Sequence, residues 1–524
     1  MNKRFRVCDL NQPFLLPPSL QEWLPEDHLA RFVADVCNEL DLSAIYAEYE
    51  RSDGRGLSAY HPLLLIRLLV YGYSIGVTSS RAIEKASYDN LAFRYLAANQ
   101  HPDHDTIASF RQEHLESLAG LFVQALRLCS KAGLIKLGSI AIDGTKILAN
   151  ASTRHSVSHQ KLSEQEQYWQ ATIERLLTEA QGRDEQEDQR FAEGRSGDGL
   201  PEELAHAQSR LERIRHAKAE LEREAQKELE ALAPHDHPRK RGRPRKQDGA
   251  VPTDEERQQL KKRKKKLSRA RKKAQQPSRQ YNFVDPDSRV MKDNGRKCFV
   301  QGYNAQIAVD SHQQVIVAAE VTQQTTDREQ LVPMVNSVRA NNSIENATVV
   351  ADAGYWDTAS LHHPALKGIR VAVSPDSQPQ PPGAPLPHNA PNNEEALCMR
   401  QWLTTPAGRA LYRVRKMTVE PVFGQIKEAR GIRRFRLRGL QRVQSEWKLI
   451  CATHNLLKLF RSGLIPPELV VSFLIFQLPS SPGVPSPRVL SDRLSGCPLF
   501  VLFVFRSEVR RAVLNRGDKP QQTP

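Results

Sequence analysis

The chain has 524 residues and a mass of 59.2 kDa, a length typical of roughly three domains. It carries 75 Lys and Arg against 60 Asp and Glu, a formal net charge of +15. No apolar run reaches the ~18 residues of a spanning helix and the N-terminus lacks a signal-like apolar stretch, so we expect neither a membrane protein nor a secreted one. The absence of CxxC argues against zinc ribbons and iron–sulfur sites.

The first 135 residues are predicted to form an all-α domain of several short helices. Apolar residues recur at helical spacing between Leu29 and Leu40. Pro62–Tyr73 is an apolar helix with proline near its first turn. Thr106–Leu128 continues the pattern, with Asp105 or Thr106 as its N-cap. We interpret this region, residues 1–135, as a separate helical N-terminal domain.

A strand is predicted at Ser139–Ile142, ending in Asp143-Gly144-Thr145. Residues 153–280 then read as an insertion. Within it, two strongly helix-forming segments carry apolar seams, which predicts an antiparallel helical hairpin with its turn at Gly182–Pro201. Self-association of these helices as a coiled coil is the alternative interpretation.

The positive charge is concentrated at the end of this insertion. Pro238–Gln280 contains 18 Lys and Arg against four Asp and Glu. Its Arg-Gly-Arg-Pro segment resembles an AT-hook, in which Arg241 and Arg243 point into the narrow minor groove of A·T-rich DNA. The alternatives are a solvated charge run, a linker, or a patch that binds nucleic acid without sequence preference. Nucleic acid is therefore the predicted partner class.

Strand signals return after the insertion and alternate with helices. The predicted strands are Tyr303–Val309, Val315–Val321, Ala347–Ala351 and Ile369–Val373, and the predicted helices are Asp327–Ala340, Trp356–Leu366 and Leu411–Phe460. Without the insertion, this order predicts an α/β domain with a ribonuclease H-like mixed sheet and flanking helices, formed by residues 136–152 and 281–460. Residues 461–524 form an atypical Pro-rich C-terminal tail that matches no element.

Three carboxylates stand at notable positions of this predicted sheet. Asp143 ends the first strand, Asp352 ends the fourth, and Glu420 lies on the late helix. In a ribonuclease H-like sheet the first and fourth strands lie side by side, so we expect the two aspartates to meet, with Glu420 completing the cluster. Singly, an Asp-Gly pair indicates a turn and Glu420 a helix surface. Together they would hold Mg²⁺, and two such ions about 4 Å apart serve phosphodiester cleavage.

The chain resembles bacterial insertion-sequence transposases of the DDE type, from about residue 10 to residue 460. The resemblance is carried by these motifs: HPLLLIRLLVYGYSIGVTSSRAIEKASYDNLAFRYL in the N-terminal region, IDGTKILANAS (Ile142–Ser152), DPDSR (Asp285–Arg289), GYNAQIAVD (Gly302–Asp310), ADAGYWD (Ala351–Asp357) and RKMTVEPVFGQIK (Arg415–Lys427). The insertion separates Asp143 from Asp352 by 209 positions.

The resemblance implies an enzyme that binds element ends and catalyses metal-dependent strand cleavage and strand transfer, with residues 1–135 as its helical N-terminal DNA-binding, or transposase, domain. Asp143, Asp352 and Glu420 would be the catalytic residues and would hold two Mg²⁺ ions, for which Mn²⁺ can substitute. The residues implied to steady DNA phosphates near the cut are Tyr412, Arg415 or Lys416, and Lys427. Trp356 either stacks on an unpaired base or packs in the core.

The resemblance also implies the partners. These are double-stranded DNA, as element ends and as target, and a second copy of the chain, since cutting two ends calls for at least a dimer on DNA. The expected location is the bacterial cytoplasm, at the nucleoid, with no membrane association. We hypothesise that the inserted hairpin and its basic arm hold end DNA or a second protomer. The alternatives are a transposase-derived DNA-binding protein without catalysis, an inactive copy, or a metal-dependent nuclease that cuts without joining.

Overall fold

The structure is a computed structural model. It describes residues 19–50, 59–190, 202–232, 268, 279–376 and 391–464, except the single positions 294, 296, 343, 345 and 392. The chain divides into two compact units. The first comprises Met1–Leu137, Asp310–Ile316 and the chain from Leu449, and the second comprises Gly138–Val309 and Val317–Lys448. The division therefore falls within two elements that we predicted to belong to the sheet domain.

The N-terminal part of the first unit is helical, as predicted. Its helices are α1 (Leu20–Trp23), α2 (Leu29–Glu39), α3 (Ser43–Glu50), α4 (Pro62–Ile75), α5 (Ser80–Asp89), α6 (Leu91–Leu96), α7 (His104–Glu113) and α8 (Leu115–Lys131). Helix α4 is the most apolar and is almost wholly buried, and its proline stands where a helix needs no backbone N–H. No single described helix is long and apolar enough to span a membrane. Among the described helices, one pair, α4 and α5, has the length and composition of a spanning segment when the two are taken together, but they are bent by 98° relative to each other.

The prediction of one helix over Thr106–Leu128 was wrong. Two helices, α7 and α8, meet at His114, which has a non-helical backbone and is buried. Its Nδ1 lies 2.8 Å from the carboxylate of Glu48, and its ring stacks on Tyr49. These contacts come from α3, so local periodicity did not reveal the break. The N-cap of α7 is Asp103, whose carboxylate accepts from the backbone N–H of Thr106 at 2.6 Å.

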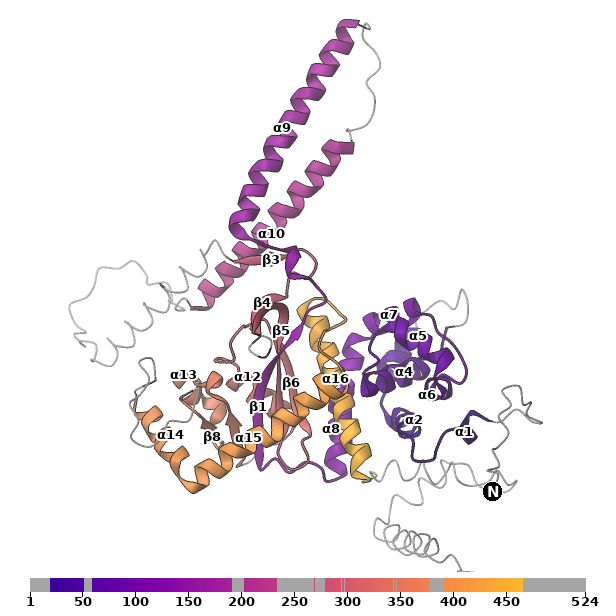
Figure 1. Cartoon of the computed structure of the whole chain (residues 1–524), viewed down its shortest axis with the longest axis vertical. Coiled ribbons are helices and arrows are strands. Elements are labelled where there is room, and N and C mark those ends of the chain that lie inside the picture. Colours follow the sequence, from indigo (N-terminus) through magenta and orange to yellow (C-terminus); the bar gives the residue numbers. More distant parts are fainter. Residues whose placement is uncertain are drawn as a thin grey trace, which may run out of the picture. The chain divides into compact units, whose positions relative to one another are not determined.

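A six-stranded mixed sheet is the centre of the second unit (Figure 1). Its strands are β1 (Ser139–Leu148), β4 (Arg289–Asp293), β5 (Cys298–Asp310), β6 (Ile316–Thr322), β7 (Thr348–Ala351) and β8 (Arg370–Val373). The order is β4-β5-β1-β7-β8, and β6 also pairs with β5. β1 runs parallel to β7 and β7 parallel to β8, whereas β4 runs antiparallel to β5. The predicted adjacency of the strands that precede Asp143 and Asp352 is confirmed.

β1 does not end at Asp143, as we had predicted, but continues to Leu148. Its pairing with β7 stops at Ile142 opposite Ala351. The neighbour on its other side, β5, is much longer, and the backbone N–H of Ala149 still donates to the carbonyl of Gln301 at 3.0 Å. Asp143 and Gly144 therefore lie within β1, beyond the point where its pairing with β7 ends. The interpretation of Asp-Gly as a turn was wrong.

The helices that follow the sheet strands differ from the predictions in detail. α12 (Leu331–Asn341) begins after a polar loop. The predicted helix Trp356–Leu366 is replaced by two 3₁₀ turns, η2 (Ala353–Tyr355) and η3 (Pro364–Leu366), around the short α13 (Thr358–Leu361). Pro364 explains part of this, because proline cannot continue the hydrogen bonding of a helix interior. The late helices are α14 (Glu394–Thr404), α15 (Pro406–Gly424) with a π turn η4 (Gln425–Ala429), and α16 (Leu440–Ser462).

The insertion contains a pair of long helices, α9 (His159–Arg190) and α10 (Glu202–Leu232), with a small ribbon of β2 (Ser156–Ser158) and β3 (Gln280–Asn282) beside them (Figure 1). The α10 seam is buried along α9, and at the base Leu162, Ile214, Leu221 and Tyr281 share one apolar cluster. The seam is thus covered within the chain. Helix α9 continues past Gly182, where we predicted the turn, because a single glycine costs only about 1 kcal/mol among good helix formers. Residues 191–201 and nearly all of the basic arm lie outside the described residues.

Candidate active site

Asp143 lies in β1, and Asp352 directly follows the last residue of β7. Each directly follows the last registered pair, Ile142 opposite Ala351. Each carboxylate accepts a hydrogen bond from a nearby glycine N–H, Gly144 at 2.8 Å and Gly354 at 2.9 Å. The two strands therefore fix both carboxylates at one edge of the sheet.

The environment of both aspartates opposes their ionisation. Burial, followed by repulsion from Asp352, raises the pKa of Asp143 to about 7, although the guanidinium of Arg415 acts in the opposite direction. Burial also raises the pKa of Asp352, again against the effect of Arg415. Two carboxylates held together in this way gain from a cation between them. Their donor set, made of carboxylate oxygens alone, is the set that Mg²⁺ and Mn²⁺ prefer.

Arg415 of α15 supplies positive charge to this site. Its Nη1 atom lies 3.2 Å from Oδ2 of Asp143, and its side chain is only 12% exposed. The guanidinium carbon lies 5.8 Å from the centroid of the Tyr412 ring. The sequence motif left Arg415 and Lys416 as alternatives for the basic residue. Arg415 contacts the site, whereas Lys416 is exposed.

Lys427 contacts the same strand from the π turn that ends α15. Its ammonium donates to Oγ1 of Thr145 at 2.9 Å and to the carbonyl of Lys146 at 3.3 Å. Lys427 thus bonds the end of α15 to the part of β1 that follows Asp143. Of the four residues expected to steady phosphates, Tyr412, Arg415 and Lys427 therefore lie near this strand end.

Glu420 lies on α15, as predicted, but its side chain is exposed. The charges that most affect Asp143 and Asp352 come from other residues. A helix turns 100° per residue, so Glu420 lies about 140° round the axis from Arg415. Within the described ranges, no group of three or more His, Cys, Asp and Glu side chains is placed to hold a metal ion. The structure therefore brings two of the three predicted acids together.

A carboxylate that sequence reasoning missed, Asp327, lies beside the two aspartates. It raises the pKa of both Asp143 and Asp352. Its Oδ1 atom lies 3.7 Å from the ammonium of Lys146. Asp327 stands in the polar loop TQQTTDREQ (322–330), which looks like ordinary solvent-exposed sequence. No local signal distinguishes it, because its neighbours come from other strands.

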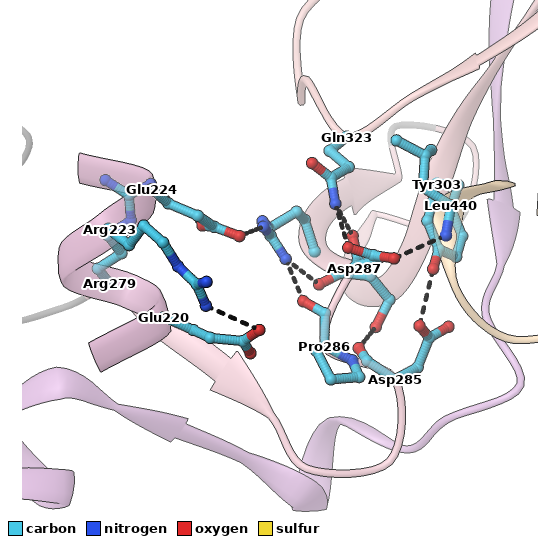
Figure 2. Close-up of polar contacts among 12 residues, drawn as sticks. Glu220, Arg223, Glu224, Arg279, Asp285, Pro286, Asp287, Tyr303, Gln323 and Leu440 are labelled. Atoms are coloured by element: carbon cyan, nitrogen blue, oxygen red, sulfur yellow. Dashed lines mark hydrogen bonds and ion pairs between the residues drawn. The ribbon is translucent and has the colours of Figure 1, made fainter. Parts of the chain in front are cut away.

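The DPDSR motif forms a polar cluster at the start of α16 (Figure 2). Asp285 accepts from the hydroxyl of Tyr303 at 2.8 Å and from the backbone N–H of Gly439 at 3.1 Å. Asp287 accepts from the N–H of Leu440 at 2.8 Å. In the first turn of a helix such an N–H has no acceptor within the helix itself. The two aspartates thus join strand β5 to the beginning of α16.

The arginine of the same motif connects the cluster to the hairpin. Arg289 donates to Glu224 of α10 at 2.7 Å and to the carbonyl of Pro286 at 2.5 Å. Arg279 also contacts Glu224, at 3.2 Å (Figure 2). The motif therefore has a structural role in the second unit, at the base of α10.

Replacing Asp285 with alanine is expected to destabilise the protein by about 2–4 kcal/mol, since the buried Tyr303 hydroxyl and the Gly439 N–H both lose their acceptor. Urea unfolding followed by tryptophan fluorescence measures this loss. The matched variant Tyr303→Phe removes only one donor and should cost about 1 kcal/mol. Equal losses in the two variants would contradict the assigned contacts.

The remaining predicted residues divide into two groups. Trp356 is 7% exposed, in agreement with the core interpretation rather than with stacking on a base. Arg241 and Arg243 of the AT-hook-like segment lie outside the described residues, as do residues 465–524 of the predicted tail.

Comparison with known proteins gives two matches to family models. Residues 18–113 match the model described as Transposase domain (DUF772), and residues 266–456 match the model described as Transposase DDE domain. The second match includes Asp352 and Glu420 and begins after the hairpin. Searches of curated proteins and of solved structures gave no match. With two transposase domains matched in the expected order, the chain belongs to the DDE-type transposases of insertion sequences.

Proposed function

We propose that this transposase binds the ends of its element, cuts a DNA strand at each end in a metal-dependent reaction, and joins the released 3′-hydroxyl to target DNA. The observation that carries the proposal is that Asp143 and Asp352 each directly follow the last registered pair of the parallel strands β1 and β7. The sheet supports a ribonuclease H-like catalytic domain, because β1 and β7 lie side by side, as expected for the first and fourth strands of that fold.

Asp143, Asp352 and Glu420 are the residues that would hold two Mg²⁺ ions, or Mn²⁺ in their place. The pair of buried, mutually repelling aspartates supports this assignment. Glu420 is included on the strength of its motif and its place on α15, the helix that carries Arg415. Bound divalent ions would activate the attacking oxygen and stabilise the leaving oxygen. Arg415 now pairs with Asp143. When DNA binds, its guanidinium would exchange this carboxylate for a phosphate oxygen.

A row of arginines beside β1 supports DNA binding. Arg434 pairs with Leu148 in a parallel bridge, so the segment after η4 lies along the strand that contains Asp143. Along this extended segment, Phe435 and Leu437 are buried, whereas Arg434, Arg436 and Arg438 are exposed. Alternation by two residues places the three arginines on one face. Such a face suits the evenly spaced phosphates of a DNA strand.

The partners that follow are double-stranded DNA, as element ends and as target, and a second copy of the chain on the DNA. Two ends must be cut in one event, which calls for two active sites. The basic arm, with Arg241 and Arg243, would add contacts to A·T-rich or nonspecific DNA. The place of action is then the bacterial nucleoid.

The direct test uses the full-length chain and linear DNA that carries this gene's own flanks. We expect Mg²⁺ or Mn²⁺ to give cuts at the flank junctions with free 3′-hydroxyls, and joined products when a plasmid target is added. A reaction with excess chelator should give none. Sequencing of the junctions maps the cuts, and the joined products distinguish a transposase from a nuclease that only cuts. Binding in a gel-shift assay with no cuts under any metal would contradict catalysis and favour a DNA-binding protein or an inactive copy.

A further inference from the structure

One carboxylate oxygen of Asp327 has three side-chain partners. Its Oδ1 accepts from the side-chain amide of Asn304 at 2.6 Å and from that of Gln306 at 2.7 Å. The ammonium of Lys146 forms an ion pair with the same oxygen at 3.7 Å. Hydrogen bonds to an ionised acceptor are roughly twice as strong as neutral ones. The Asp327 side chain, which is 22% exposed, thus connects Lys146 of β1 with Asn304 and Gln306 of β5.

The two amides that bind Asp327 are themselves held rigidly. Asn304 and Gln306 are two positions apart on β5, hence on one face of the sheet, and both are fully buried. The Asn304 amide also donates to the carbonyl of Gln324 at 3.2 Å. The Gln306 side chain accepts from the hydroxyl of Tyr355, which follows Asp352 by three residues. We call Asn304, Gln306 and the Asp327 carboxylate that they bind the platform. Through Tyr355 it extends toward Asp352.

Gly144 lies directly against this platform. A Cβ atom at Gly144 would stand 2.2 Å from Nε2 of Gln306 and 2.7 Å from Oδ1 of Asp327, so only glycine fits. The N–H of Gly144 is the one that binds the carboxylate of Asp143. The direction of the Asp143 carboxylate consequently depends on where the platform holds this backbone.

The other oxygen of Asp327 lies near Gly354. A Cβ atom at Gly354 would stand 3.7 Å from Oδ2 of Asp327. The N–H of Gly354 binds the carboxylate of Asp352. One side chain thus stands beside both glycines whose N–H groups orient the catalytic carboxylates.

We propose that Asp327 is a positioning residue of the active site. It acts through the Asn304–Gln306 platform and Lys146, and sets the separation of Asp143 and Asp352 by holding the backbone beside each. The role in catalysis rests on the proposed function. Small errors in such a separation are costly, because a misplacement of about 1 Å can lower a rate by ~10²-fold.

The test compares the full-length wild-type protein with Asp327→Asn, which keeps the size of the side chain and removes its charge. Two quantities are measured on flank DNA: the single-turnover cleavage rate at saturating DNA and the dissociation constant of the DNA. Hydrogen exchange of peptides that cover residues 143–148 and 352–356 is measured without DNA or metal. We expect cleavage to slow by about 100-fold with the dissociation constant changed less than about twofold. Exchange in both peptides should quicken by about tenfold.

The matched control is Asp357→Asn. Asp357 is also a hydrogen-bonded, ion-paired carboxylate, contacting Ser360 and Arg328, but its contacts lie outside the platform. Its replacement should leave cleavage rate and exchange of residues 143–148 unchanged. A second variant, Lys146→Gln, is combined with Asp327→Asn in a double-mutant cycle. Because both residues act through one contact, the double variant should cleave little more slowly than the slower single variant.

Several outcomes would overturn the proposal. One is that both peptides of the Asp327→Asn variant exchange hydrogen at the wild-type rate. Another is that the variant exchanges faster but cleaves DNA at the wild-type rate. Additive losses in the cycle would remove Lys146 from the role. If the wild-type protein binds DNA and never cuts, the proposed function fails, and exchange alone then decides whether Asp327 holds the two aspartates.

Discussion

Asp352→Asn is expected to lower the rate of metal-dependent strand cleavage by about 10³-fold or more, because several kcal/mol of transition-state stabilisation depend on the ions that this carboxylate helps to hold. The fold should tolerate the change. The amide oxygen of asparagine can still accept from the N–H of Gly354, as the carboxylate does at 2.9 Å. Cleavage of end-labelled flank DNA on a denaturing gel measures the rate, and a gel shift measures binding, which should change less than about twofold.

The control for this prediction is again Asp357→Asn, five positions further on and outside the pair of buried aspartates. It should cleave at the wild-type rate. If Asp352→Asn cleaves as fast as the wild type, Asp352 does not hold a catalytic ion, and the meeting of the two aspartates has another purpose.

Asp143→Asn is expected to stabilise the metal-free protein while abolishing cleavage. The pKa of Asp143 is raised from 3.8 to about 7 in the folded chain, chiefly by burial and then by Asp352. Below pH 4 the group is neutral in both states and costs nothing. As the pH rises from 4 to 7 the unfolded chain releases its proton first, so stability falls, and above pH 7 the full loss is present. One pKa unit corresponds to about 1.4 kcal/mol, so the loss amounts to roughly 4 kcal/mol.

The measurement is urea unfolding in chelator at several pH values between 5 and 8.5. The variant should exceed the wild type in free energy of unfolding by about 2–4 kcal/mol at pH 8, with the difference shrinking toward pH 5. Taking the difference between the two proteins cancels the titration of all other groups. A difference that is constant with pH, or a variant less stable at pH 8, would contradict the account of Asp143.

The insertion is where sequence and structure agree in kind and differ in extent. The heptad-like seam on α10 identified a buried helix face correctly, because helical periodicity is a local property of the chain. The end of α9 was misplaced, since one glycine does not stop a helix made of good helix formers. Whether the basic arm binds DNA stays a prediction.

Sequence patterns alone predicted the helical N-terminal region, the mixed α/β character of the rest, and the adjacency of the strands before Asp143 and Asp352. Those features follow from hydrophobic period and element order, which short segments encode. Tertiary contacts were needed to distinguish Arg415 from Lys416, to extend β1 past Asp143, and to bring Asp327 near it. Asp327 lies in a loop and Arg415 on helix α15, at 184 and 272 positions along the chain from Asp143. No local pattern predicts such contacts, because their energy exists only once the sheet and the elements packed against it have formed.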